Sequence, residues 1–244
     1  MTRCGRLLAA ILVNAFYEMQ NYPIVLVNSL ISPLSFLLLI VFVSNGQLIG
    51  VGIMGGFIMS MFSAGMALQA DLTHLKNDFK LQDMIVSSPT SQSMYMFGMA
   101  LSEITYSLPA IITLTVLGFI FIKMSVLATF GFILVLVLIF FISTLMGFFF
   151  STLSSDIVQS FAFSRMLSTL FSTIPPIFYT INYIPEPYRF IAYLSPTTYA
   201  ALLCHNFGGY IQLPLSMIIF SWLILIVLIV FLFILNAKRS KWRE

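Results

Sequence analysis

The sequence predicts an all-α membrane protein with six transmembrane helices, and three observations favour this fold. Of the 244 residues, 60% are hydrophobic and 8% are charged, whereas a soluble domain carries about 25% charged residues. Apolar runs near the roughly 20 residues that one membrane span needs recur along the chain. The polar stretches between these runs are too short to form a soluble domain of ordinary size. Residues 1–244 are therefore expected to form a single membrane domain.

The expected elements follow from the alternation of apolar and polar stretches. Residues 5–21 carry apolar side chains at helical spacing and are predicted to form an amphipathic helix in the membrane interface. Pro175 and Pro176 should interrupt the fifth span near its far end, because a proline lacks the backbone donor and clashes with the preceding turn. The six spans are expected at residues 24–44, 48–70, 95–122, 126–150, 161–180 and 213–236.

Residues 181–212, between the last two spans, are aromatic and half polar. Ser195-Pro196 is a typical helix start, with a capping serine before a proline at the first helical position. Gly208-Gly209 is a typical helix stop. This external segment is predicted to form two short helices in the membrane interface, over residues 186–194 and 196–207.

Glycines in and before the second span leave two alternatives open. Gly46, Gly50, Gly52 and Gly56 form two GxxxG spacings, which let helices approach closely. The spacing fits a dimer seam and packing inside one subunit equally well.

Three residues are candidates for lining a transport pathway. Met59 and Met66 could give an adaptable lining for apolar molecules, although core or lipid-facing packing is the more common role of such methionines. Glu103 lies in the third span, and a carboxylate within a membrane should face protein or water. It either lines the pathway or reaches water at the inner interface. Arg165, near the inner end of the fifth span, is expected to anchor the helix at that interface.

Basic residues predict the orientation, because cytoplasmic loops carry an excess of lysine and arginine. With both termini in the cytoplasm, two basic residues, Lys123 and Arg189, fall on the outer side and nine on the inner side. This bias fits an even number of spans in the cell membrane. It also accounts for the net charge of +3 without a nucleic-acid partner. The inner residues are Arg3, Arg6, Lys76, Lys80, Arg165, Lys238, Arg239, Lys241 and Arg243.

A polar stretch between the second and third spans has the pattern of a contact helix. Asp78 can cap a short helix whose apolar face is formed by Leu81, Met84 and Ile85 at i, i+3 and i+4. The helix should end before Pro89, because the residue preceding a proline disfavours helical backbone angles. An exposed helix held between two spans offers a surface on which a soluble partner can push.

The order of these elements, together with two motifs, resembles the permease subunit of ABC-2 type exporters, a group that includes drug, polysaccharide and lipid exporters. The first motif is DFKLQDMIVSSPTSQSMYMFG, residues 78–98, with an acidic residue, a leucine-containing helix and Ser-Pro before the third span. The second is IPEPYRFIAYLSPTTYA, residues 184–200, with a proline-containing loop, a short helix and a Ser-Pro-x-Thr-Tyr turn. The resemblance covers nearly the whole chain. It departs from the family at Lys80, where Gly-Thr is frequent, and at Cys204-His205, where a basic residue is frequent.

The resemblance implies a transport subunit that works with a separate ABC ATPase and with a second copy of itself or a similar permease, among membrane lipids. ATP and Mg²⁺ would bind to the ATPase, since the chain has no GxxxxGK[ST] phosphate loop, and no cofactor or metal is expected on this chain. The ATPase is expected to contact the coupling loop 71–93 through Asp78, Phe79, Lys80, Leu81, Asp83, Met84, Ile85, Ser88 and Pro89. The external segment is expected to cap the pathway through Pro185, Pro187, Ser195, Pro196 and Tyr199.

Two other function classes are alternatives. A secondary transporter would need ionisable or unwound sites at mid-membrane, for which Glu103 is a poor candidate. A membrane-embedded enzyme would need a nucleophile with its base or a metal site, and the sequence contains no HExxH, zinc-ligand spacing or GxSxG. Export of an amphipathic, lipid-like or drug-like molecule, without catalytic residues of its own, is therefore the leading hypothesis.

Overall fold

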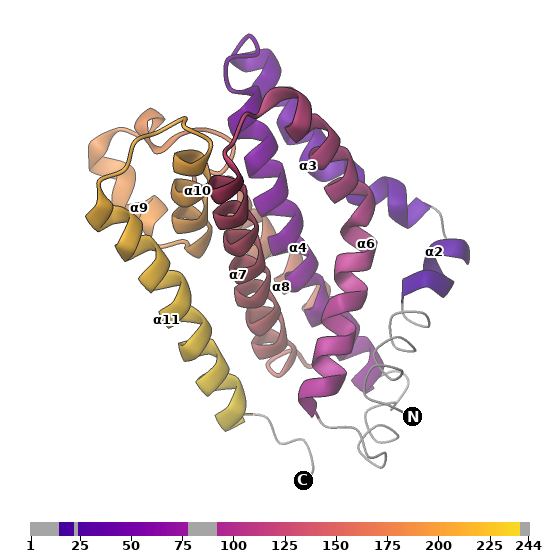
Figure 1. The fold of residues 1–244 in the computed structure, drawn as a ribbon. Helices are drawn as coiled ribbons and strands as arrows, with labels where there is room; N and C mark the ends of the chain where they lie inside the picture. The colour runs from indigo at the N-terminus through magenta and orange to yellow at the C-terminus, as the bar shows by residue number, and fades with distance from the viewer. Residues whose placement is uncertain (1–14, 22–23, 78–91, 240–244) are drawn as a thin grey trace.

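The structure, a computed structural model, describes residues 15–21, 24–77 and 92–239, and within these ranges every regular element is a helix (Figure 1). This confirms the predicted all-α class. The elements are α2 (Tyr17–Asn21), α3 (Ile24–Val43), α4 (Ile49–Asn77), α6 (Gln92–Phe121), α7 (Val126–Ser151), α8 (Ile157–Thr173), the 3₁₀ helices η2 (Ile181–Tyr183) and η3 (Glu186–Tyr188), α9 (Arg189–Tyr193), α10 (Pro196–Phe207) and α11 (Leu215–Arg239).

Four helices in the described part of the chain are long and apolar enough to cross a membrane. They correspond to the second, third, fourth and sixth expected spans, and they cover Ile49–Thr73, Gly98–Phe121, Val126–Ser151 and Leu215–Lys238. The first expected span is the helix α3, whose apolar stretch is shorter, Ser29–Val43. The fifth is α8, which has 17 residues, fewer than the roughly 20 that an upright span needs. Six crossings, and an interfacial helix ending in α2, stay predictions.

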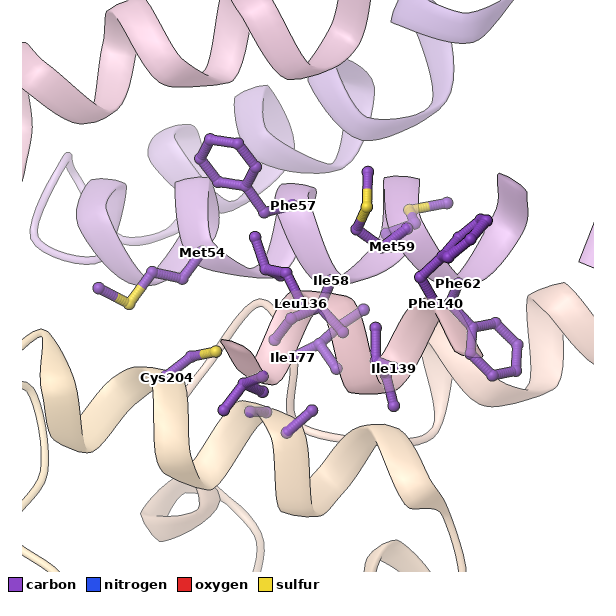
Figure 2. Packing of buried hydrophobic residues seen from close by; sticks show 14 of the residues in the cluster. Met54, Phe57, Ile58, Met59, Phe62, Leu136, Ile139, Phe140, Ile177 and Cys204 are labelled. Carbon is purple, nitrogen blue, oxygen red and sulfur yellow. The ribbon is translucent and has the colours of Figure 1, made fainter. Parts of the chain in front are cut away.

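The centre of the bundle is α4. Its apolar window is 89% buried, whereas the windows of α6 and α11 are each 11% buried. The helices α3, α6, α7, α8 and α10 all pack on it. Figure 2 shows Ile58 and Phe62 of α4 against Ile139 of α7, with Ile177 between the two helices and α10. The surrounding helices expose apolar side chains outward, as expected of a bundle whose solvent is lipid.

Glycines let neighbouring helices approach the backbone of α4. A Cβ at Gly52 would lie 2.8 Å from Cδ1 of Leu37 on α3, and a Cβ at Gly56 would lie 2.9 Å from Cδ2 of Leu114 on α6. Gly46 instead lies in the turn between α3 and α4, with a φ of +81° that favours glycine. The glycines at positions 52 and 56 therefore serve packing within one subunit, which was one of the two alternatives for the GxxxG spacings.

The helices α4 and α7 also approach each other closely. A Cβ at Gly147 would lie 2.7 Å from the carbonyl oxygen of Gly65. A Cβ at Gly65 would lie 2.6 Å from the backbone nitrogen of Thr144 and would overlap the hydroxyl of Ser143. Since backbone atoms cannot rotate away, both positions need glycine, and the two helices meet backbone to backbone.

The polar stretch after the second span is partly helical, which corrects its expected boundaries. α4 continues to Asn77 instead of ending at residue 70, and α6 begins at Gln92 instead of residue 95. Neither glycine nor proline interrupts the sequence from residue 71 to residue 77, so nothing in it forces the helix to stop. The described helices leave residues 78–91 between them.

The helix α8 lies closer to the N-terminus than the span expected at residues 161–180. Asp156 caps its start, because its Oδ1 accepts a hydrogen bond from the backbone N–H of Gln159 at 2.7 Å. At the other end, Pro175 and Pro176 interrupt the chain as predicted, and the helix does not resume beyond them. The cap explains the early start, and the missing proline donors explain the early end.

Apart from Arg165, which lies in the middle of α8, the basic residues of the described chain sort to the two ends of the bundle. The last turns of α4 and α11, which carry Lys76 and Lys238, lie at the same end as the start of α6 (Figure 1). Lys123, between α6 and α7, and Arg189, at the start of α9, lie toward the other end. The sorting agrees with the predicted orientation, while the side of the membrane that each end faces stays a prediction.

Gly65→Ala should loosen the contact between α4 and α7, since the added methyl group meets a backbone nitrogen and a hydroxyl of α7. Overpacking of this kind costs about 1–3 kcal/mol, so we expect a lower unfolding temperature in detergent. Gly118→Ala is the matched control, because a Cβ there would meet only Cγ2 of Ile53 at 4.0 Å. Equal unfolding temperatures for the two variants would contradict this packing.

Candidate functional site

The predicted coupling residues lie outside the described part of the chain. All of them, from Asp78 to Pro89, fall within the stretch between α4 and α6. The two helices that border this stretch are described, and Asn77 at the end of α4 lies at the same end of the bundle as Gln92 at the start of α6 (Figure 1). A force applied between them would therefore enter the bundle through α4 and α6.

Close to that end, five buried polar side chains form a contact between α4 and α8 that we name the hydroxyl seam. Its members are Gln69 and Thr73 of α4, Ser154 before α8, and Ser160 and Ser164 of α8. The Ser160 hydroxyl donates to the carbonyl oxygen of Gln69 at 3.0 Å. The Ser164 hydroxyl donates to the next carbonyl along the seam, that of Met66, at 2.9 Å.

Side-chain pairs complete the seam. The hydroxyl oxygens of Thr73 and Ser160 lie 2.9 Å apart, and the Gln69 amide nitrogen donates to the hydroxyl of Ser154 at 3.2 Å. The Gln69 Oε1 atom is buried and accepts no hydrogen bond within the described residues. Because lipid gives helices little hydrophobic reason to associate, hydrogen bonds of this kind contribute about 1 kcal/mol each to helix association. The seam therefore fixes α8 on α4.

A serine stripe in α8 is the sequence signal for this seam. Serines recur at every fourth position, Ser160, Ser164, Ser168 and Ser172, which is the spacing of neighbours along one helix face. Small polar residues at this spacing are typical of helix–helix interfaces in membranes. The stripe was not among the sequence predictions, because the residues between the serines are mixed in character and include large apolar side chains such as Phe161, Phe163 and Leu167.

The candidate pathway residues lie inside the bundle. The exposed fractions of Met59, Met66 and Glu103 are 7%, 0% and 5%. Both methionines belong to the main apolar cluster, and Figure 2 shows Met59 beside Phe57 and Phe62 on α4. Within one chain, the two methionines therefore pack in the apolar core and do not line an open pathway. Glu103 is buried on α6, which packs along α4.

The last short helix of the external segment is buried against the bundle, while its predicted place at the membrane interface stays a prediction. α10 has the predicted bounds, but it packs against α4, α7 and α11, and its residues 196–205 are buried. Of the predicted cap residues, Pro185 and Pro187 are exposed, whereas Ser195, Pro196 and Tyr199 are buried. The structure therefore does not bring these five residues together on one surface.

Hydrogen bonds at the start of α10 allow this burial. The Ser195 side chain was expected to cap the helix, but it does not. Its hydroxyl instead lies 2.8 Å from that of Thr197. Thr197 also donates to the carbonyl oxygen of Phe171 on α8 at 2.6 Å. The Tyr199 hydroxyl donates to the carbonyl oxygen of Tyr193 at 2.9 Å. Carbonyl groups of α8 and α9 that lack helical partners are thus satisfied inside the protein.

The far end of α10 is closed as the sequence predicts. Gly209 has a φ of +74°, and the N–H of Tyr210 donates to the carbonyl oxygen of His205 at 2.9 Å, as in a Schellman motif. The buried Nε2 of His205 lies 3.2 Å from the carbonyl oxygen of Ile177, and because a carbonyl can only accept, this nitrogen donates. Burial lowers the pKa of His205 to about 4, so the ring is neutral near pH 7.

A second polar line lies on the outer surface of α8. Arg165, Thr169 and Thr173 are spaced four residues apart, and all three are exposed. Each directly follows a serine of the stripe, so the line lies about 100° around the helix axis from the seam. α8 is therefore polar on a buried face and on an adjacent exposed face.

Comparison with known proteins agrees with this architecture. The family model for ABC-2 type transporters matches residues 6–203. No curated protein matches the chain. The matched part is well over half of the 244 residues, and it contains the central helix, the hydroxyl seam and both motifs. The chain therefore belongs to the ABC-2 type transporter family, as a multi-pass membrane permease that serves as a transport subunit.

Proposed function

We propose that the chain is the membrane subunit of an ABC exporter that moves an amphipathic, lipid-like or drug-like molecule out of the cytoplasm. A separate ATPase subunit, which binds ATP and Mg²⁺, drives the movement. One observation carries the proposal: α4, the most buried of the four long apolar helices, ends at Asn77, directly before the predicted coupling helix. The helix that the ATPase would push is therefore continuous in sequence with the helix on which the bundle is packed.

The contacts of α4 suit it for passing on a movement. It meets α7 backbone to backbone at Gly65 and Gly147, so a displacement of α4 carries α7 with it. It meets α8 through the hydroxyl seam, whose Thr73 lies one turn from the end of α4. A push at that end thus reaches α7 and α8 through short, specific contacts, which is what alternating access needs.

The route for the cargo lies on the outer surface of the chain, against a second copy or a similar permease. The interior is filled by the apolar cluster around Met59 and Met66. The outer face of α8, in contrast, carries Arg165, Thr169 and Thr173. A charge that faces lipid costs several kcal/mol, so this face suits a water-containing route between two subunits. The end of the bundle that carries Lys76 and Lys238 faces the cytoplasm, because basic residues are in excess on the cytoplasmic side of a cell-membrane protein.

Leu81→Ala combined with Met84→Ala should separate the permease from its ATPase. These residues form the apolar face of the predicted coupling helix, which would seat in a groove of the ATPase. Truncating a buried interface anchor costs about 2 kcal/mol or more, roughly thirtyfold in affinity. Transport and co-purification of the ATPase should both fall, while the yield of inserted protein stays unchanged.

Lys80→Ala and Asp83→Ala are the controls for the coupling helix. They should have smaller effects, because exposed ion pairs contribute about 1 kcal/mol or less. Normal transport by the Leu81 and Met84 double variant, with its partner retained, would show that this stretch is a plain connection.

Thr73→Val combined with Ser160→Ala tests the hydroxyl seam. The changes remove the hydroxyls with little change in volume, so the ATPase should still co-purify and hydrolyse ATP. Transport per ATP should fall several-fold, because a cross-helix bond worth about 1 kcal/mol no longer ties α8 to α4. Thr113→Val is the control, since its hydroxyl donates within α6 to Pro109 at 2.8 Å. Unchanged transport per ATP in proteoliposomes would argue against the seam as a link.

Thiol labelling tests the orientation. In a background without Cys4 and Cys204, single cysteines at Asn77 and Ser240 should resist an impermeant reagent in intact cells. A cysteine at Glu186, whose side chain is exposed, should react. The opposite pattern, with Ser240 labelled and Glu186 protected, would place the predicted coupling helix outside the cell and rule out a cytoplasmic ATPase partner.

A further inference from the structure

The outer face of α8 carries polar groups that the described part of the chain does not use. No hydrogen bond or ion pair among the described residues involves the guanidinium of Arg165 or the hydroxyls of Thr169 and Thr173. All three side chains are exposed. Within a membrane, a guanidinium and two hydroxyls that have no partner in the described part of the chain call for partners elsewhere, because unsatisfied polar groups in lipid are costly.

Three threonines of α6 and α7 behave differently, although the buried hydroxyl of Thr144 on α7 has no hydrogen bond within the described residues. Thr105 and Thr113 of α6 and Thr129 of α7 each donate a hydrogen bond to the carbonyl oxygen four residues earlier, at 3.0, 2.8 and 3.0 Å. This internal bond lets a hydroxyl face lipid without an external partner. Thr169 and Thr173 make no such bond, so their hydroxyls are available to a ligand.

The three groups form a line that fits an elongated molecule. Successive members are one turn apart along α8, about 6 Å, so the line is about 12 Å long. Apolar side chains border it, and Met166 and Leu170 are 54% and 43% exposed on the same surface. A polar line between apolar side chains matches a molecule with a polar head and an apolar chain.

We propose that Arg165, Thr169 and Thr173 bind the head of an anionic amphiphile, with its phosphate or carboxylate at Arg165. The planar guanidinium can donate two parallel hydrogen bonds to either anion. The threonine hydroxyls donate to ester, amide or sugar oxygens of the same molecule, and the apolar chain lies along the bordering side chains. The inference rests on the proposed function, since it names the class of cargo for the route along α8.

Charge favours an anionic ligand over a carboxylate of a second copy. Two α8 helices related by a twofold axis along the membrane normal would place Arg165 beside the partner's Arg165 at equal depth, and like charges there repel. Asp156, the acidic residue nearest in sequence, lies nine positions earlier and caps α8 through Gln159. Two guanidinium groups at one depth would therefore call for an anion between them.

Direct binding is the first test. The purified chain in a neutral maltoside detergent is titrated with decyl phosphate, with inorganic phosphate and with decanol, and bound copies are counted by native mass spectrometry. Decyl phosphate should bind most tightly. Arg165→Gln should weaken it about tenfold, the loss of one charged hydrogen-bonding group, and Thr169→Val with Thr173→Val should weaken it several-fold. Arg189→Gln and Thr113→Val, which alter groups used within the chain, are the matched controls.

Three outcomes of this titration would overturn the proposal: unchanged binding of decyl phosphate in Arg165→Gln, equal binding of decanol, and inorganic phosphate binding as tightly as decyl phosphate. A fourth separates cargo from structural lipid. If phosphatidylglycerol at bilayer concentrations displaces the probe and phosphatidylcholine does not, the site holds membrane lipid, and the assignment to cargo fails.

Transport by the complex with its ATPase separates this inference from the proposed function. Export of a fluorescent decyl phosphate from proteoliposomes should fall about tenfold in Arg165→Gln, while a neutral fluorescent amphiphile is unaffected. Equal export of the anionic probe by Arg165→Gln and the wild type would reject the site but keep the exporter. Binding that depends on Arg165 in a chain that never associates with an ATPase would keep the site but reject the exporter.

Discussion

The backbone contact between α4 and α7 determines how the rest of the bundle is arranged. In lipid, apolar side chains gain little by meeting one another instead of acyl chains, so helices associate through close packing and hydrogen bonds. Gly65 and Gly147 remove the side chains that would separate the two helices, and the gain in close packing follows from that approach. With α7 fixed against it, α4 offers its remaining faces to α3, α6, α8 and α10, which explains why so little of it is exposed.

The contact of α8 with the bundle is of another kind. On its buried face, Ser160 and Ser164 donate to carbonyl oxygens of α4, and its start and end are set by Asp156 and Pro175. Such a helix depends on a few directional bonds, each worth about 1 kcal/mol, in addition to apolar packing such as that of Phe171 on Phe62. It is also the long helix that carries an exposed arginine and two unpaired threonines within the described chain. One helix thus joins the central helix on one face and offers ligand chemistry on the next.

The burial of α10 also depends on hydrogen bonds that satisfy backbone polar groups inside the protein. Irregular backbone at membrane depth is tolerated only where protein surrounds it and satisfies its hydrogen bonds. Thr197 and Tyr199 donate to carbonyl oxygens of Phe171 and Tyr193, so the turn before α10 can enter the bundle without water. The hydrogen bonds that Thr197 and Tyr199 make inside the protein therefore account for the Ser-Pro-x-Thr-Tyr turn. A role as an exposed cap is not needed to explain these residues.

The sequence by itself determined the helices and the family. Long apolar runs predicted four of the helices that can span a membrane, and Pro175-Pro176 and Gly208-Gly209 marked breaks that the structure confirms. These features are local, because backbone donors and positive φ angles depend on the residue itself and its neighbours. The order of the two motifs indicated the ABC-2 family, and the family model agrees.

Only the tertiary structure decided which apolar helix lies at the centre, and where α10 goes. α4 and α6 have nearly the same mean hydropathy, yet one is almost fully buried and the other is mostly half-buried or exposed. The composition of a helix cannot separate these cases, because lipid and protein core accept the same apolar side chains. What distinguishes α4 is contact between distant residues, such as Gly65 with Gly147 and Thr73 with Ser160. Contacts of this kind exist only once the helices have packed.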